Sequence, residues 1–383
     1  MNAATRLMSS LSWSLVVAAA GLAGCGAEEP LQQPKKQAAA SAAPVVVRSA
    51  EATSATSDAR GTFRVFFTLP EGRTSLQIDL QNVTDDTPVS VVRLVEPSGA
   101  VVLSNDELDL ARMDSLSLWP TGTQAQLAWP VAPTSEPLPA GTWTLDFGLY
   151  TLGGFGVQRT GVDVAVDIAS KSDPDTARGV LAVHVVYVDG VDEDPDLAEG
   201  VEAALALWQE EVRRSHGLTV RLRTSASDGA LAEPWQGNDV FTALSGLAQS
   251  YELTMVVGAS FDSLSLLGQA GGVPGALVPS ARSAIAVAAR NAAGRDGVLE
   301  GVEVTILSET IAHEVGHYLG LRHVVEGSFA SFDPVADTPE CSDEDECLAL
   351  LKKNLMFPFG VSTGQTEVTD GQREVLQHAV AVD

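Results

Sequence analysis

The eleven residues from His313 to His323 constrain this chain more than any other segment. They read HEVGHYLGLRH and fill every fixed position of the pattern H-E-x-x-H-x-x-G-x-x-H. At ordinary residue frequencies five fixed positions would match by chance in roughly one chain in 10⁵. The segment therefore predicts a metal site rather than unrelated histidines in a protein core.

The spacing also predicts how these side chains meet. Residues four apart lie on one face of a helix, so His313 and His317 can bind one ion while Glu314 lies beside them as a base. Gly320 can adopt a positive φ, which would end the helix and let His323 return as a third ligand. Three neutral imidazoles leave one tetrahedral position open, which is typical of catalytic rather than structural zinc sites.

Several further motifs follow the histidines. They are DPVADTP at 333–339, Cys341 and Cys347, NLM at 354–356 and TDGQ at 369–372. In this order the motifs resemble those of the metzincin zinc peptidases, and among them the pappalysin and cytophagalysin branch. The resemblance covers about residues 307–372. It implies a zinc metalloendopeptidase in which Glu314 activates a zinc-bound water to hydrolyse peptide bonds of extracellular or periplasmic proteins.

The resemblance also assigns roles to the downstream residues. Met356 is expected to pack beneath the zinc site, and Cys341 and Cys347 to form a disulfide. Calcium is a second candidate cation, and a solvated acidic run is the alternative reading of the same loop. The candidate calcium ligands are Asp333, Asp337 and Thr338. The chain departs from many relatives in one respect, because Phe357 and Pro358 follow the Met where those relatives carry a Tyr two residues on.

The N-terminus predicts export. Residues 1–25 contain an apolar run at 11–20 that is too short to span a membrane, and they end in LAGC. This ending resembles the bacterial lipobox, in which Cys25 would carry the lipid anchor; an ordinary signal peptide cut near Ala23 is the alternative. We therefore expect a cell-envelope lipoprotein at the outer membrane or cell surface. With Cys25 lipidated, the other two cysteines remain as one pair in an oxidising compartment.

Net charge limits the partners. The formal charge of −27 argues against binding to nucleic acid or to anionic membrane surfaces, since both require a basic face. Such a surface mainly keeps an exported protein soluble. If the acidic segment 343–346 borders the substrate cleft, we also expect a modest, salt-sensitive preference for Lys or Arg near the scissile bond.

The first half of the chain has the composition of a tether and then of a β-domain. Residues 26–60 are rich in Ala, Ser, Pro, Gln and Glu without periodicity, which predicts a disordered tether. Residues 61–171 contain short alternating runs, such as 62–68 and 142–147, separated by turn residues. This rhythm predicts an all-β sandwich. A prodomain, a binding module and a spacer are its possible roles, and the absence of Cys excludes inhibition by a cysteine switch.

The second half predicts an α+β domain. After a linker at 172–177, residues 178–383 are expected to form a metzincin-like domain with a twisted mixed sheet and an active-site helix that begins near residue 307. The β-branched run 180–188 is suited to a central strand, with His184 in the core, and a helix is expected from Asp194 to Ser215. We expect His378 to lie at the surface.

One segment is a candidate for substrate binding. Residues 270–278 are small and Gly-rich, and in relatives the strand at this place lies at the sheet edge above the zinc. An exposed edge offers free backbone groups, so a peptide substrate could bind there as an extended strand. A flexible surface loop is the alternative.

A rival function belongs to a different class. The protein could be a surface lipoprotein that acts as a binding module with a structural or degenerate zinc site. The missing Tyr after Met356 and the unassigned β-domain motivate this reading. Glu314 argues against it, because a purely structural site requires no base.

Overall fold

The computed structural model describes residues 47–104, 123–132, 136–151, 154–155, 157–172, 179–231, 239–263, 265–280, 282–360 and 363–383. The predicted signal peptide, the lipidation site Cys25, most of the predicted tether and most of the linker lie outside these residues. Within the described part, no helix combines the length and the apolar character needed to cross a membrane.

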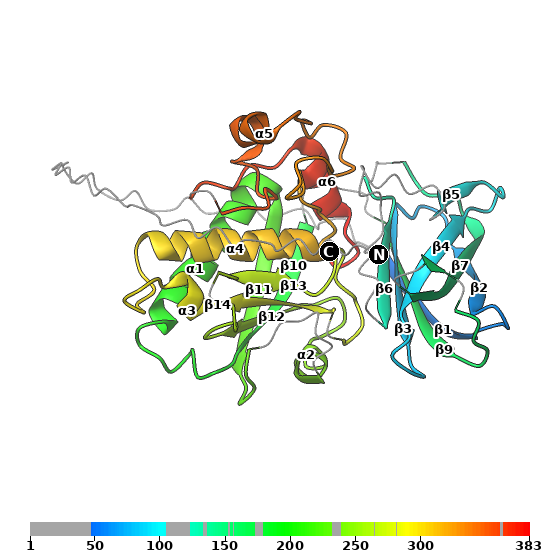
Figure 1. Ribbon diagram of the computed structural model, residues 1–383, viewed down its shortest axis with the longest axis horizontal. Helices are drawn as coiled ribbons and strands as arrows, with labels where there is room; N and C mark the ends of the chain where they lie inside the picture. The colour runs from blue at the N-terminus through cyan, green and yellow to red at the C-terminus, as the bar shows by residue number, and fades with distance from the viewer. Residues whose placement is uncertain are drawn as a thin grey trace, which may run out of the picture. The chain divides into compact units, whose positions relative to one another are not determined.

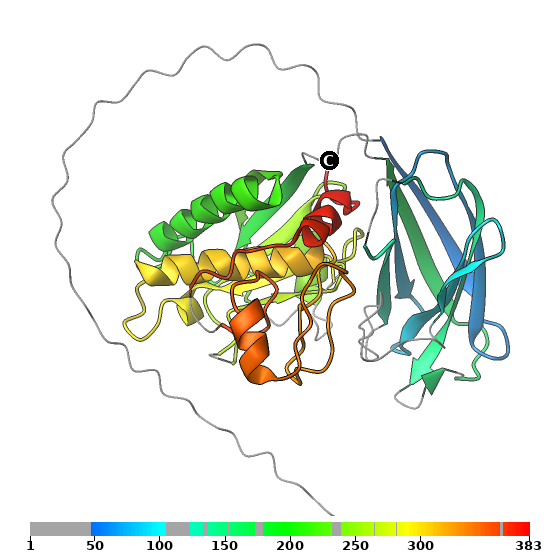
Figure 2. The ribbon, with the colours of Figure 1, turned by 90° about the horizontal axis from the view of Figure 1, so that it is seen from above.

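Two antiparallel sheets form a β-sandwich from the first half of the chain (Figure 2). One sheet has the order β1-β9-β3-β6, and the other has β2-β7-β4-β5 with β8 beside β7. The strands are β1 (Val47–Thr56), β2 (Thr62–Leu69), β3 (Ser75–Asn82), β4 (Val89–Val95), β5 (Val101–Ser104), β6 (Gln124–Trp129), β7 (Gly141–Thr151), β8 (Gly154–Phe155) and β9 (Asp163–Ser172).

The alternation along these strands builds the core of the sandwich. In β2 every second side chain is buried. These side chains lie beside alternate residues of the neighbouring strand β7, and both sets point into the space between the two sheets. Phe63 stacks on Phe147 with ring centroids 4.5 Å apart, and Trp143 is fully buried. The period of two in the sequence was therefore a valid signal for strands here.

The predicted tether is wrong over its last residues. Val47–Thr56 forms strand β1, which pairs along its whole length with β9. Its sequence, VRSAEATSAT, has little apolar alternation because most of its described side chains are exposed. Backbone hydrogen bonds to a neighbouring strand hold this strand, and such bonds leave no compositional signal.

A five-stranded sheet forms the base of the second half, residues 179–383, with the order β11-β10-β12-β14-β13. Four strands are parallel, and β13 runs antiparallel to β14 at the edge. The strands are β10 (Gly179–Tyr187), β11 (Leu218–Ala226), β12 (Leu253–Gly258), β13 (Gly268–Ala270) and β14 (Ala284–Ala288). The edge strand thus lies at 268–270, and the prediction that 270–278 is the edge strand is wrong except for its first residue.

Helices cover both faces of this sheet (Figure 1). Alternate residues of β10, such as Val183 and Val185, pack in one core with α1 and α4, whereas Val186 on the other face packs with Leu244 of α2. The helices are α1 (Ala198–Glu211), the π-helical turn η2 (Val212–His216), α2 (Asp239–Ser245), α3 (Ala289–Ala292), α4 (Val302–Tyr318), α5 (Glu344–Leu351) and α6 (Asp370–His378).

The helix that carries the histidines is longer than predicted. It begins at Val302 rather than near residue 307, after Gly301 with a φ of 58°. Glu303 in its first turn interacts favourably with the helix dipole. The helix predicted from Asp194 to Ser215 is confirmed as α1 followed by η2, although it begins four residues later.

Strands β3 and β9 of the sandwich contact the second half of the chain. Gln77 Nε2 donates to Gly275 O at 2.7 Å, and Asp79 Oδ2 accepts from the Leu277 N–H at 2.8 Å. Lys171, which is fully buried, donates through Nζ to Gln377 O at 2.6 Å, near the C-terminal end of α6. A cation there interacts favourably with the carbonyls at the helix end, which no N–H of the helix can reach.

These contacts overturn one prediction. His378 was expected at the surface, but it is only 2% exposed, and its carbonyl accepts a hydrogen bond from Ser75 Oγ. Strand β3, which carries Ser75 and lies more than 300 residues earlier in the sequence, covers His378. A local sequence pattern cannot predict such a distant partner. His184 is buried in β10 as predicted, with Nε2 2.8 Å from Ser225 Oγ.

Candidate metal centre

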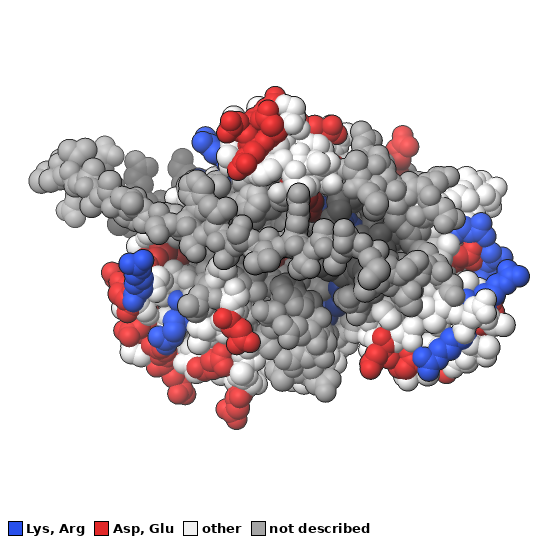
Figure 3. Space-filling view, viewed as in Figure 1, with Lys and Arg blue, Asp and Glu red and all other residues white. Residues whose placement is uncertain are grey.

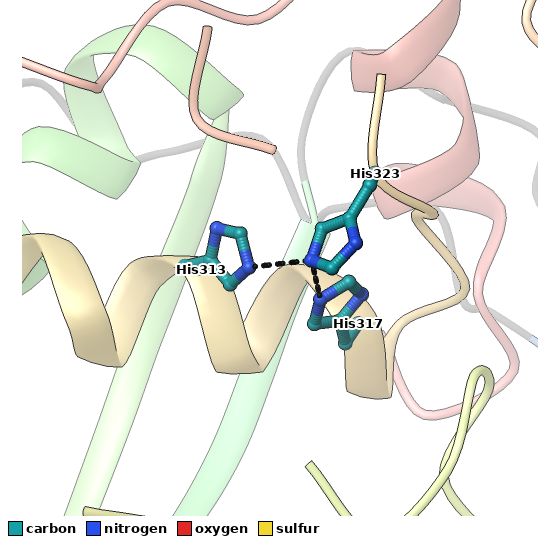
Figure 4. Close-up of side chains that lie close together, drawn as sticks. All are labelled: His313, His317 and His323. Carbon is teal, nitrogen blue, oxygen red and sulfur yellow. Dashed lines mark hydrogen bonds between the residues drawn. The ribbon is translucent and has the colours of Figure 1, made fainter. Parts of the chain in front are cut away.

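Three histidine side chains converge at the C-terminal end of α4 (Figure 4). His313 and His317 project from the same face of the helix, which ends at Tyr318. Gly320 follows with a φ of 110°, and Leu321 donates back to Gly316 O, so the chain reverses and carries His323 to the other two rings. The Nε2 atom of His323 lies 3.3 Å from that of His313 and 3.1 Å from that of His317.

Each ring is held through its other nitrogen. His313 Nδ1 lies 2.7 Å from Leu355 O, and His317 Nδ1 lies 2.8 Å from Leu321 O. His323 Nδ1 lies 3.3 Å from Glu326 Oε2. A carbonyl or carboxylate oxygen only accepts hydrogen bonds, so the proton of each neutral ring is placed on Nδ1. All three Nε2 lone pairs are then left facing one another.

This arrangement fits a bound metal ion. Imidazole nitrogens about 2.0–2.1 Å from one tetrahedral ion lie roughly 3.3 Å apart, close to the two separations found here. With every proton on Nδ1, no hydrogen remains to join the Nε2 atoms, and a cation between them removes the repulsion of their lone pairs. Within the described residues, these histidines form the one group of three or more potential ligands that could hold a metal ion.

Burial keeps His313 and His317 neutral. It lowers the pKa of His313 to about 4, and the repulsion that a second imidazolium at His323 would exert acts in the same direction. Burial also lowers the pKa of His317 well below its ordinary value. Both rings are therefore unprotonated near neutral pH, as metal ligation requires.

Glu314 lies between α4 and the edge strand β13. It is 8% exposed, and burial raises the pKa of its carboxyl to about 8, while the backbone N–H of Ala270 acts in the opposite direction. A Cβ added to Gly268 would lie 2.8 Å from Glu314 Cγ, so β13 passes directly against this side chain. A cation bound by the neighbouring histidines would favour the carboxylate and lower its pKa.

Met356 lies against the same helix. It is fully buried, and its N–H donates to Asn354 Oδ1 at 2.9 Å. Its sulfur occupies the space next to Gly316, in the helical turn between the first two histidines. The structure thus places Met356 in a packing position, and Leu355, one residue earlier, supplies the carbonyl that orients His313.

The downstream motifs meet in one hydrogen-bond network around Gln372. Its amide exchanges hydrogen bonds with the side chain of Asn354 and donates to Asp333 Oδ2 at 3.5 Å. Gln372 also forms a capping box with Thr369 at the start of α6. The network therefore ties the acidic loop and helix α6 to the turn that supplies Leu355 and Met356.

The predicted calcium ligands take part in these protein contacts. Asp333 accepts hydrogen bonds from the Val335 N–H and from Thr338 Oγ1, and burial raises its pKa to about 7. Asp337 accepts from Thr369 Oγ1 and from the N–H of Gly371. Both carboxylates thus bind α6 to the loop, and the calcium site stays a prediction.

The disulfide and the acidic segment lie around α5. Cys341 is disulfide-bonded to Cys347, as predicted. Residues 343–346 are exposed, and Figure 3 shows the acidic side chains gathered over α5. Two of them cap the helix: Asp343 Oδ1 accepts from the Glu346 N–H, and Glu346 Oε2 accepts from Ser342.

Glu326, the partner of His323, was not predicted from the sequence. A carboxylate three residues after a ligand histidine is a usable signal, since metal-bound imidazoles commonly donate their second N–H to a carboxylate. The carbonyls of Leu321 and Leu355 were not predicted either. Backbone groups of this kind have no signature in a sequence.

Comparisons with known proteins add little to this geometry. No family model and no curated protein matches the chain. Metalloproteinase-II from Bacteroides fragilis is 14% identical with a TM-score of 0.33, and the alignment covers 56% of this chain and 62% of that one, less than two thirds of its length. A structure described as Bacillus endospore appendages is 10% identical with a TM-score of 0.18, covering 37% and 100% of the two chains.

A family two carbohydrate esterase from Cellvibrio japonicus is 9% identical with a TM-score of 0.16, covering 56% of this chain and 68% of that one. Similarities this weak carry no argument about function.

Proposed function

We propose that this protein is a zinc-dependent endopeptidase. The observation that carries the proposal is the convergence of three Nε2 lone pairs from His313, His317 and His323, at the end of a helix that also carries the buried carboxyl of Glu314. Three neutral imidazoles favour zinc among the common biological metals and leave one tetrahedral position for a reactant. A base beside that position is needed for hydrolysis but not for a structural site.

Zinc held by these histidines would supply a Lewis acid that polarises a scissile carbonyl and lowers the pKa of water. Glu314, the residue that follows His313 in α4, would take the proton from the attacking water and transfer it to the leaving amine. Leu355 O and Glu326 would hold two of the rings in the required tautomer. Pro358, two residues after Met356, offers no hydroxyl, so no tyrosine acts from that position.

The edge strand suggests how substrate would bind. β13 pairs with β14 on one side only, and Glu314 lies against its residues Gly268 and Ala270. We propose that a substrate peptide adds to the free edge of β13 as an extended strand, which would bring its backbone to the histidines. Gly268 and Ala270, the first and last residues of β13, are small and leave room for such an approach.

We also propose that the C-terminal half is a metzincin-like domain of the pappalysin and cytophagalysin branch. Support comes from the network around Gln372, which joins the acidic loop, the Asn354 turn and the start of α6. These are the downstream motifs on which the resemblance rests. All of these motifs take part in the one hydrogen-bond network around Gln372, which explains why they occur together in one sequence.

The test compares the purified full chain with Glu314→Gln on a general protein substrate, with the zinc content of each measured. We expect cleavage by the wild type, loss on chelation, recovery with added zinc, and at least roughly 10²-fold lower activity in the variant at unchanged zinc content. Glu303→Gln, in the first turn of α4, is the matched control. Stoichiometric zinc with no cleavage by the wild type would favour the rival binding module.

A further inference from the structure

A cavity of about 300 Å³ lies between the β-sandwich and the second half of the chain. Its walls come from β3 and β9, from the connection between α2 and β12, and from the loop that joins β13 to β14. The described residues that line it include neither the three histidines nor Glu314. The volume falls at the lower end of the range for small-molecule sites, about 300–1,000 Å³.

Two carboxyl groups face each other in its wall. Asp79 of β3 and Asp167 of β9 are directly opposite in the antiparallel register. Like charges in this position destabilise a sheet. Asp79 is 4% exposed and has partners, since its carboxylate accepts from Gln77 Nε2 and from the Leu277 N–H.

Asp167 differs from Asp79. It is half-buried, and within the described part of the chain it has neither a hydrogen-bond partner nor an ion-pair partner. Burial raises the pKa of its carboxyl. A cation placed between the two carboxyls would satisfy Asp167 and reduce the repulsion across the strands.

The remaining wall defines the kind of cation. The described lining contains no Lys or Arg, and its third acid, Glu252, is already paired with Arg223 at 2.6 Å. The run Leu277 to Pro279 supplies apolar surface next to the carboxyls. Two carboxylates are few for a bare metal ion, whereas an ammonium group carries three donors and can be followed by an apolar stem.

We propose that this cavity binds a primary amine with a short aliphatic body, its ammonium group between Asp167 and Asp79 and its carbons along Leu277 to Pro279. This site does not depend on the proposed peptidase activity. It does contact the metal-binding helix, because the Tyr318 ring lines the cavity and its hydroxyl donates to Ala276 O at 3.1 Å.

The probe is n-hexylamine, compared with the neutral 1-hexanol, titrated into the zinc-loaded full chain by calorimetry. We expect saturable binding of the amine and at least about tenfold weaker binding of the alcohol. Asp167→Asn should weaken amine binding about tenfold or more without lowering the melting temperature, because it removes a like-charge contact. Asp163→Asn, on the same strand, should bind as the wild type does.

Equal affinity for the amine and the alcohol would overturn the proposal. Unchanged amine binding by Asp167→Asn would also overturn it, because the amine would then bind elsewhere, for example at the metal. Either result would leave peptide hydrolysis untouched, since that is measured without the amine. Failure of this site is thus distinguishable from failure of the proposed function.

Discussion

Gly316 and Met356 lie in direct contact: a Cβ built on Gly316 would lie 2.7 Å from Met356 Sδ. The glycine is in the helical turn between His313 and His317, and the methionine is fully buried. The sulfur therefore supports the turn that aims both rings. The absence of a side chain at residue 316 permits this contact.

We predict that Gly316→Ala weakens metal binding and destabilises the protein. Alanine favours a helix over glycine by roughly 1 kcal/mol, whereas overpacking a closed core costs about 1–3 kcal/mol. Because the Sδ of the fully buried Met356 would lie only 2.7 Å from the added Cβ, we expect the overpacking cost to exceed the gain, with a net loss of up to about 2 kcal/mol in the free energy of unfolding. Chemical denaturation and zinc titration measure the two effects. Gly360→Ala is the control, since nothing lies within 4 Å of a Cβ there.

Gln372→Ala should disconnect α6 from the Asn354 turn. The side chain is fully buried, and its loss leaves the amide of Asn354 and the carboxyl of Asp333 with fewer partners. We expect about 2–3 kcal/mol lower stability and roughly 10-fold to 100-fold weaker zinc binding. Competition with a chromophoric chelator measures the affinity. Unchanged affinity in Gln372→Ala, or equal weakening in Glu374→Ala on the exposed face of α6, would contradict this role.

Metal removal should lower the melting temperature. Without a cation the three Nε2 lone pairs repel, and the ion's binding energy no longer favours the folded state. Free zinc at 100 times its dissociation constant contributes about 2.7 kcal/mol. Scanning calorimetry with and without a chelator measures the difference. His323→Ala should respond little to the chelator, and a full response in that variant would show that the stabilising ion binds elsewhere.

Stability should fall as pH rises through neutrality, in part because of Asp79. Burial raises the pKa of its carboxyl from an ordinary value of 3.8 to about 7. The folded state therefore binds the proton more tightly, so the stabilisation is fully present below about pH 4 and is lost as pH rises through about 7. The loss is about 4 kcal/mol at most. Asp79→Asn should flatten the unfolding free energy between pH 5 and 8, and Asp163→Asn should not.

We further predict that Cys25→Ala releases the protein from the membrane. The prediction rests on the lipobox-like sequence LAGC, since a lipidated cysteine would be the anchor. Fractionation of cells that express each form, followed by immunoblotting, tests this prediction. If the variant gave the same membrane-bound mature protein, anchoring through Cys25 would be wrong.

Local spacing was sufficient to predict the candidate metal ligands. Positions i and i+4 share a helix face whatever the rest of the chain does, and Gly320 adopts the positive φ that its lack of a side chain permits. The alternating strands of the sandwich, such as Thr62–Leu69, were predictable for the same reason. Both signals depend only on neighbours in sequence.

Features that depend on distant partners were not predictable. His378 is buried because Ser75 and its strand lie over it, and β1 exists because β9 offers a row of backbone groups. The edge strand is shorter than its Gly-rich surroundings suggested, because pairing with β14 ends at Ala270. The orienting partners of His313 and His317 are backbone carbonyls, which every residue type carries, so the sequence does not reveal them.

The buried ammonium of Lys171 has a consequence for proteolytic processing. It binds the last turn of α6 in the second half of the chain. Ser75 and Asp79 also form hydrogen bonds to that half, at His378 and Leu277. Cleavage of the chain between residues 172 and 179 would therefore give a nicked molecule whose two fragments remain associated without a covalent link. Separating them would leave the α6 carbonyls without their cation, so the fragments should co-elute until a denaturant is added.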